Sequence, residues 1–251
     1  MVYWAYTENV TGGSITSVAK GRLSENETTM ESVTVIYRSN TPFNGNLHFG
    51  ARIVMDKTGH LLVSIGERSS TNMRVLAQSV SSSLGKVIRI TTDGVAAADN
   101  TKFSGVGALP ELYTMGHRNP QGLVYNANLN LLYGIEHGDK TDDEINILEK
   151  GMNYGWKDIH GFHDDDNFPG EAAYVANYVP HPQIPNDHLV EPIYSICAVP
   201  TPSSNVGTSW CTIAPSDGIY YKSASIPEWT NSILLVTLKK GDNTNMELYR
   251  F

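Results

Sequence analysis

The chain has 251 residues, of which 40% are apolar, so it is long enough to bury a sizeable core. Its 18 Lys and Arg residues against 26 Asp and Glu residues give a formal charge of −8, which argues against nucleic acid or an anionic membrane as a partner, because both bind a basic face. No apolar run is long enough to span a bilayer.

Short segments rich in Val, Ile, Tyr and Thr alternate with Gly, Asn, Asp and Pro, which predicts an all-β fold built from short strands. Segment 52–67 aligns without a gap with segment 122–137, and both have the pattern of an apolar strand, a polar turn and a second apolar strand. The other predicted strands lie at residues 3–6, 14–19, 85–90, 143–148, 232–238 and 246–251.

A buried inner hairpin followed by a more polar outer strand, repeated along the chain, is typical of β-propeller blades. The repeats amount to about three to four blades, so residues 1–251 are predicted to form a single partial propeller domain; a compact four-bladed propeller or a β-sandwich is the alternative. The long irregular segments around 67–83 and 155–200 are expected to be functional, because loops of that length inside a compact domain usually are.

The only two cysteines, Cys197 and Cys211, flank a loop rich in Pro, Ser and Gly. This spacing favours a small disulfide-closed loop, while two unrelated reduced thiols are the alternative.

Two motifs carry side chains suited to catalysis or ligand binding. His48 precedes a predicted inner strand, where a neutral imidazole can act as a general base. Arg118 and Asn119 precede Pro120, and together they offer a rigid fork of donors and an amide to a planar ligand that carries carboxylate or carbonyl oxygens. A structural role for each of these residues is the alternative.

Two acidic loops are candidate metal sites. The loop 137–144 concentrates carboxylates of the kind that bind calcium, and the loop 160–166 would bind calcium or, through His160 and His163, a softer metal. Solvated acidic loops are the alternative for both.

The strings Gly116-His-Arg-Asn-Pro-Gln-Gly122, Asp142-Asp-Glu-Ile-Asn146 and Asn153-Tyr-Gly-Trp156, in this order and spacing, resemble the soluble sugar dehydrogenases that depend on pyrroloquinoline quinone (PQQ), the glucose and aldose sugar dehydrogenases. The resemblance extends from about residue 48 to residue 239. It implies a six-bladed β-propeller in which PQQ lies over a calcium ion, and of which this chain is an incomplete set of blades.

Residue by residue, the resemblance implies His48 as the catalytic base and Glu67 as the acid that orients it, although Asp is usual at that position in the glucose enzymes. Arg118 would contact PQQ and stabilise the developing oxyanion. The further PQQ contacts implied are Asn119, Thr212 and Lys239.

The resemblance also implies two calcium sites. Backbone carbonyls of Gly138 and Asp139 would bind the calcium under the quinone, and a carbonyl ligand tolerates Asp139 where the family often has Pro. The second, structural site would comprise Glu144, Asp164 and the carbonyls of His160 and Phe162.

The implied activity is oxidation of an aldose, glucose-like, to its lactone by hydride transfer to PQQ, with an external electron acceptor as a partner, a homodimer left open, and a periplasmic or secreted location. The family's first blade has no counterpart before Met1, and its Arg-rich last loop has none beyond Phe251. We therefore expect this chain to bind PQQ weakly or not at all. The alternatives are a non-catalytic propeller that binds carbohydrate or protein, and a calcium- or zinc-dependent hydrolase using the His160 cluster.

Overall fold

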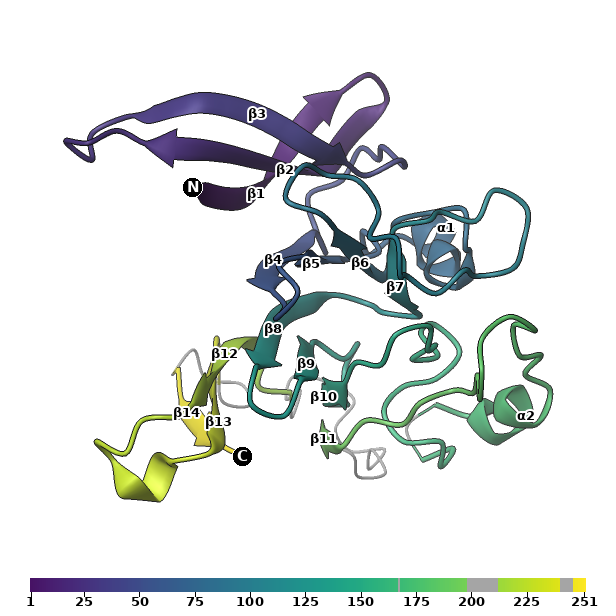
Figure 1. The fold of residues 1–251 in the computed structure, drawn as a ribbon. Coiled ribbons are helices and arrows are strands. Elements are labelled where there is room, and N and C mark those ends of the chain that lie inside the picture. The colour runs from purple at the N-terminus through teal and green to yellow at the C-terminus, as the bar shows by residue number, and fades with distance from the viewer. Residues whose placement is uncertain (167, 198–211, 240–245) are drawn as a thin grey trace.

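The computed structural model describes residues 1–166, 168–197, 212–239 and 246–251. Their strands form four antiparallel sheets that follow one another along the chain (Figure 1). The all-β prediction is confirmed, because helices in the described residues are short. They are α1 (Thr71–Arg74), α2 (Glu171–Ala176) and the 3₁₀ helices η1 (Val75–Gln78) and η3 (Pro227–Trp229). None of them is long and apolar enough to cross a membrane.

The first sheet has three strands and the second has four, each in sequence order. Strands β1 and β2 pair through a tight turn, where Gly12 and Gly13 take positive φ angles of 94° and 136° that favour glycine. The strands are β1 (Val2–Val10), β2 (Gly13–Leu23), β3 (Met30–Arg38), β4 (Gly50–Met55), β5 (Leu61–Ile65), β6 (Lys86–Ile90) and β7 (Leu112–Met115).

The third sheet has four strands and the fourth has three. They are β8 (Pro120–Asn126), β9 (Leu131–Glu136), β10 (Asp143–Ile147), β11 (Tyr194–Ile196), β12 (Pro215–Tyr221), β13 (Ser232–Thr237) and β14 (Leu248–Arg250). The two similar sequence segments form the hairpins β4-β5 and β8-β9, which occupy equivalent positions in the second and third sheets. Strand β8 contacts both β4 and β12, so the first strands of these three sheets are neighbours.

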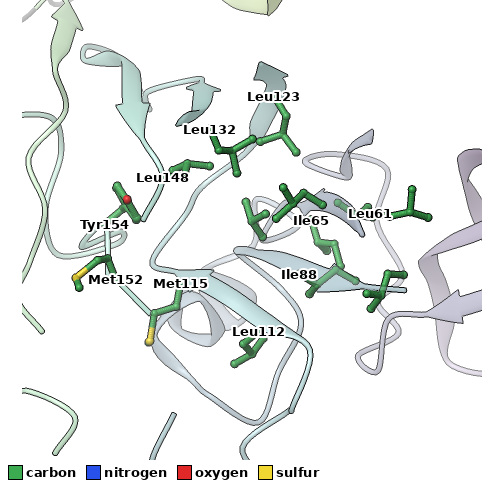
Figure 2. Packing of buried hydrophobic residues seen from close by; sticks show 14 of the residues in the cluster. Leu61, Ile65, Ile88, Leu112, Met115, Leu123, Leu132, Leu148, Met152 and Tyr154 are labelled. Carbon is green, nitrogen blue, oxygen red and sulfur yellow. The ribbon is translucent and has the colours of Figure 1, made fainter. Parts of the chain in front are cut away.

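The main core lies between neighbouring sheets. Every residue of β5 and of β6 is buried, because these strands are covered on both faces. Figure 2 shows Ile65 and Ile88 of the second sheet packing in the same cluster as Leu123 and Leu132 of the third. A second, smaller cluster joins the third and fourth sheets through Ile135 and its neighbours.

The long segments expected to be functional contain short elements. Segment 67–83 holds α1 and η1, and the described part of segment 155–200 holds α2 and β11. Cys197 is disulfide-bonded, and its expected partner, Cys211, lies outside the described residues.

Candidate functional site

His48 and Glu67 lie together although 19 positions separate them in sequence. His48 ends the loop before β4 with a left-handed φ of 53°, and Glu67 follows β5 with a fully buried side chain. The Nδ1 atom of His48 lies 2.6 Å from Oε1 of Glu67. A carboxylate at this position accepts a hydrogen bond from Nδ1–H, so Nε2 is the ring nitrogen that can take up a proton. The arrangement is that of an oriented general base.

The Arg118 turn is attached to this pair through the backbone. The Glu67 N–H donates to the Arg118 carbonyl at 2.9 Å. At the end of β9, Glu136 Oε1 accepts the backbone N–H groups of Arg118 and Asn119, and its Oε2 lies 3.0 Å from His117 Nδ1. One buried carboxylate therefore orders the whole turn, which would otherwise leave two N–H groups unpaired.

The Arg118 guanidinium points to the loop after β9. It donates to the His137 carbonyl at 3.2 Å and to Asp139 Oδ1 at 3.0 Å. Burial works to raise the pKa of Asp139, but the charges of Arg118 and Arg74 outweigh it and hold that pKa below its usual value. The structure thus brings two residues predicted from separate motifs, Arg118 and Asp139, into direct contact.

Asn119 uses its side chain to hold the protein together. Its Oδ1 accepts the backbone N–H of Gly50 at 3.2 Å and Nε2 of Gln121 at 3.1 Å. The Gly66 Cα lies so close that a Cβ there would come within 2.9 Å of this oxygen and 2.3 Å of the His48 carbonyl. The Asn119 amide oxygen therefore connects the backbone that follows His48 with the Arg118 turn.

A small cavity of about 10 Å³ collects five of the predicted site residues. This volume is about that needed to hold one water molecule or ion. The predicted residues in its lining are Arg118, Gly138, Asp139, Glu144 and His160. Gly138 has no room for a side chain, because a Cβ would lie 1.8 Å from the Thr141 carbonyl oxygen.

Glu144 lines this cavity, and Asp143 precedes it in β10. Burial raises the pKa of Glu144 to about 8, with a further contribution from Glu136, and burial raises the pKa of Asp143 to about 6. Glu144 Oε1 accepts the Gly161 N–H at 2.9 Å. Carboxylates in such surroundings are stabilised in the charged form by a nearby cation.

The predicted second metal site is only partly assembled. Glu144 and His160 line the same cavity, whereas Phe162 and the exposed Asp164 are not in its lining. Glu171 instead holds this loop, since its Oε1 accepts the His160 N–H at 2.7 Å. In the described ranges, no three His, Cys, Asp or Glu side chains gather as a ready metal-binding cluster, so a metal here would depend on carbonyl ligands.

Thr212 and Lys239 lie near the Gly138 loop through Asp143. Asp143 Oδ1 accepts the Gly138 N–H at 2.9 Å and its Oδ2 accepts the Ile213 N–H, next to the buried Thr212, at 2.7 Å. The Lys239 N–H donates to the Ile213 carbonyl at 3.3 Å, and the Lys239 charge acts on Asp143. Thr212 and Lys239 thus lie close to the Gly138 loop, where Asp143 of the third sheet binds the segment that precedes the fourth sheet.

Sequence reasoning assigned no role to four residues that the structure places around the site: Arg74, His137, Trp156 and Glu171. Trp156 belongs to the motif 153–156, so the sequence contained a signal that could have placed it at the site. Arg74 lies in the segment 67–83, but nothing in its local pattern predicts a contact with residue 139, 65 positions away.

Six buried side-chain atoms around the site have no hydrogen-bond partner in the described part of the protein. They are Glu67 Oε2, Arg68 Nε, Arg74 Nε, Arg118 Nε, His137 Nε2 and Trp156 Nε1. Four of the six, the three arginine Nε atoms and Trp156 Nε1, are N–H donors. Because buried polar groups in proteins are almost always paired, the concentration of these donors here fits a ligand that carries hydrogen-bonding oxygens. The residues present therefore suit an oxygen-rich anionic cofactor.

The chain is similar to several known sugar dehydrogenases. The aldose sugar dehydrogenase YliI of Escherichia coli is 36% identical over 156 residues, which are 62% of this chain and 41% of that protein. Quinoprotein glucose dehydrogenase B of Acinetobacter calcoaceticus is 35% identical over 187 residues, covering 63% of this chain and 38% of that protein. A solved glucose dehydrogenase structure matches with a TM-score of 0.76 at 27% identity, covering 99% of this chain and 67% of its own.

The chain spans about two fifths of the length of these two relatives. A family model matches residues 1–250, and it is the model of the Glucose / Sorbosone dehydrogenases. The match covers all four sheets and every predicted site residue, so the chain belongs to the glucose/sorbosone dehydrogenase family.

Proposed function

We propose that the protein takes part in PQQ- and calcium-dependent oxidation of an aldose, glucose-like, to its lactone. The observation that carries the proposal is the contact of the His48–Glu67 pair with the Arg118 turn: Glu67 binds His48 through its side chain and the Arg118 carbonyl through its backbone N–H. The family membership and the quinoprotein relative support the same chemistry.

In this proposal His48 Nε2 takes the proton of the sugar's anomeric hydroxyl, and Glu67 stabilises the imidazolium that forms. Arg118 stabilises negative charge that develops on oxygen during the reaction. When bound, PQQ supplies the hydride acceptor and calcium supplies a Lewis acid for its carbonyl. The Glu67 N–H bond to the Arg118 carbonyl ties the backbone beside His48 to the Arg118 turn, which supports a fixed arrangement of the two turns in this proposal.

The groups that would hold the cofactor are Arg118, Asn119, Thr212 and Lys239, and the Gly138 and Asp139 carbonyls would hold calcium. Glu144, whose pKa is raised, supports a cation in the cavity that it lines. Asp164 and the His160 and Phe162 carbonyls remain proposed ligands of a second calcium ion.

The four sheets, in this proposal, are blades of a six-bladed propeller. The contacts of β8 with β4 and β12 support it, because first strands of successive blades line a central axis. A periplasmic or secreted location, supported by the Cys197 disulfide, and an external electron acceptor complete the proposal.

The hydrolase alternative would use His160 and His163 together, and in the described residues these two histidines have different neighbours. His160 stacks on Phe168 at 4.1 Å between ring centroids and lies 4.7 Å from Trp156. His163 instead lies 3.8 Å from Glu191.

The test uses the purified protein with PQQ and calcium. PQQ binding is followed by its absorbance, and aldose-dependent reduction of a dye measures turnover. His48→Asn is expected to bind PQQ like the wild type and to lose turnover by at least about 100-fold, since general-base catalysis contributes about that much or more. His188→Asn, at an exposed histidine, is the control.

Calcium chelation should weaken PQQ binding. Aldose binding that is indifferent to PQQ and calcium would instead favour a non-catalytic carbohydrate-binding role. Full turnover by His48→Asn would remove this histidine from the mechanism.

A further inference from the structure

Arg74 and Arg118 converge on the same two side chains. Arg74 comes from α1, and its Nη1 and Nη2 atoms each lie 3.5 Å from one oxygen of Asp139. Arg118 Nη2 lies 3.0 Å from Oδ1 of the same carboxylate. The Cζ atoms of both arginines lie 5.4 Å from the centroid of the Trp156 ring. Two guanidiniums thus share one carboxylate and one indole.

The two guanidiniums have one carboxylate, Asp139, as a shared ion-pair partner. Each guanidinium is permanently charged, whereas Asp139 carries a single negative charge. Other carboxylates line the adjoining cavity, but Glu136 uses Oε1 for the backbone N–H groups of Arg118 and Asn119. In a protein with a formal charge of −8, binding of an anion depends on such local cationic groups.

The cluster also has hydrogen-bond donors to spare. Arg74 Nε, Arg118 Nε and Trp156 Nε1 are buried without an acceptor among the described residues. Leaving buried donors unpaired costs free energy, so an incoming oxygen acceptor would be favoured here.

Asp139 holds the two arginines unequally. Its contact with Arg118 is a normal charged hydrogen bond, whereas 3.5 Å to Arg74 is at the limit for one. The Arg74 and Asp139 side chains are 28% and 29% exposed, against 10% for Arg118. The weaker contact is therefore the more accessible one.

We propose that Arg74 and Arg118 form a carboxylate-binding pair, in which Asp139 is a resident counter-ion that a carboxylate of the ligand replaces at Arg74. The ligand class is a planar polycarboxylate. Only its identification as PQQ rests on the function proposed above.

Arg74 is not needed to hold its own segment in place. Lys86 Nζ donates to the carbonyls of Leu76, Ala77 and Leu84, and Gln78 Nε2 donates to the Trp156 carbonyl at 2.6 Å. Replacement of Arg74 should therefore leave the fold intact, which makes binding the direct readout.

The experiment measures the affinity of the calcium-free protein for two probes at low salt, by tryptophan fluorescence and calorimetry. The probes are benzene-1,2,4-tricarboxylate, which has no redox chemistry, and PQQ. Arg74→Gln should weaken binding of both about tenfold, because it removes one charge-assisted fork. Arg74→Lys, which keeps the charge without the fork, should recover part of the loss. Arg22→Gln, at an exposed arginine paired with Glu31, is the matched control and should bind like the wild type.

The direction in which Asp139→Asn changes probe affinity distinguishes the proposal from a purely structural role. This substitution removes the competing carboxylate and keeps the backbone carbonyl, so it should strengthen binding of both probes severalfold. A purely structural role for the cluster predicts weaker binding in both Asp139→Asn and Arg74→Gln, and that result would overturn the inference. Equal binding by Arg74→Gln and wild type, or no binding of either probe to the wild type, would overturn it too. Tricarboxylate binding that follows these signs without PQQ binding would support the pair while ending the PQQ proposal.

Discussion

Arg68 donates to the carbonyl oxygen of His48 twice, from its backbone N–H at 3.4 Å and from Nη1 at 2.8 Å. The same guanidinium donates to the Gly66 carbonyl and to the Thr16 hydroxyl, and it lies 4.2 Å from the centroid of the Phe49 ring. The left-handed turn that presents His48 is therefore anchored to the first sheet by one buried side chain.

Loss of this anchor should lower the catalytic activity that depends on His48 more than it weakens PQQ binding. We expect Arg68→Met to lower turnover about tenfold and to destabilise the protein by about 2 kcal/mol, because several buried acceptors lose their donor. PQQ affinity should stay unchanged. Thr16→Val, which removes only one of the acceptors, should lower turnover and stability in the same direction but by less. Turnover at saturating PQQ and denaturant unfolding measure both; full turnover by a folded Arg68→Met protein would separate Arg68 from the site.

Lys86 should stabilise the segment that carries Arg74. It is fully buried, and all three of its Nζ contacts are backbone carbonyls, while burial lowers its pKa well below the ordinary value. Lys86→Met removes the buried charge but leaves three carbonyls unpaired, so we expect a net loss of about 2 kcal/mol in unfolding free energy. Amide hydrogen exchange should rise most in residues 75–84. The exposed Lys102, replaced by Met, is the control, and an equal effect of both changes would contradict this view.

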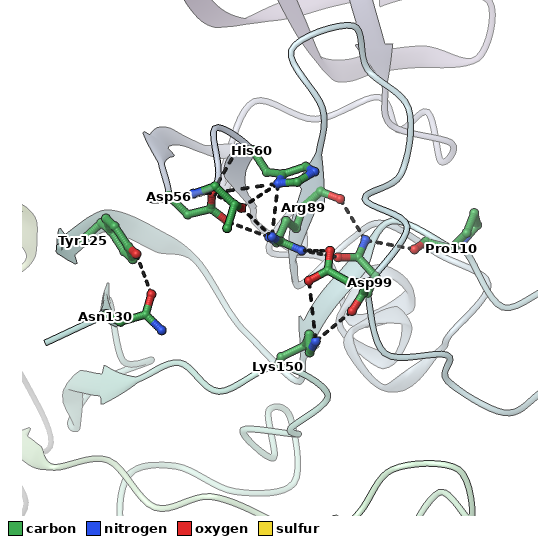
Figure 3. A network of polar contacts seen from close by, with 10 residues as sticks. Asp56, His60, Arg89, Asp99, Pro110, Tyr125, Asn130 and Lys150 are labelled. Atoms are coloured by element: carbon green, nitrogen blue, oxygen red, sulfur yellow. Dashed lines mark hydrogen bonds and ion pairs between the residues drawn. The ribbon is translucent and has the colours of Figure 1, made fainter.

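Asp56 should make the second sheet sensitive to acid (Figure 3). Burial works to raise its pKa, but hydrogen bonds from Thr58 and Arg89 and from backbone N–H groups prevail and lower it from 3.8 to about 2. A lowered acid pKa contributes stability that is present above pH 3.8 and is lost as the pH falls towards 2.

We therefore expect Asp56→Asn to be less stable than the wild type at pH 7, with the difference shrinking as the pH falls below 4. Thermal unfolding between about pH 2 and pH 7 checks this prediction. Asp93→Asn should change stability little at any pH, because Asp93 is exposed and forms a single surface ion pair with Lys20. A constant difference between Asp56→Asn and wild type would show that the pKa of Asp56 is not lowered.

Gly138 should tolerate no side chain. Its Cβ would meet the carbonyl oxygens of Thr141 and Asp142 at 1.8 Å and 2.5 Å, so the turn would have to open. We expect Gly138→Ala to abolish the rise in melting temperature on adding calcium, because the carbonyls proposed as ligands would move apart. Gly59→Ala is the control: a Cβ there meets nothing within 4 Å, and it should keep the calcium response at a cost of about 1 kcal/mol for its positive φ. A calcium response retained by Gly138→Ala would exclude this turn as the site.

The strands that sequence patterns predict best lie in hairpins whose two apolar runs and turn are contiguous in sequence. Segments 52–67 and 122–137 were recognisable because the apolar run, the turn and the second apolar run are all local features. Strand β12 was not predicted, since a bulge between Pro215 and Asp217 interrupts its alternation. Strand β11 has only three residues, too few for a pattern.

For the site, the sequence alone determined which residue types stand in which order: a histidine before one inner strand, an arginine and asparagine before another, and an acidic loop after it. Only the tertiary structure decided that Arg74 and Arg118 share Asp139, that the Asn119 oxygen is bound to backbone, and that Glu171 accepts the His160 N–H. The physical reason is that strand patterns arise from burial of neighbouring residues, whereas these contacts join side chains from separate sheets and loops, whose distances are set by how the sheets pack.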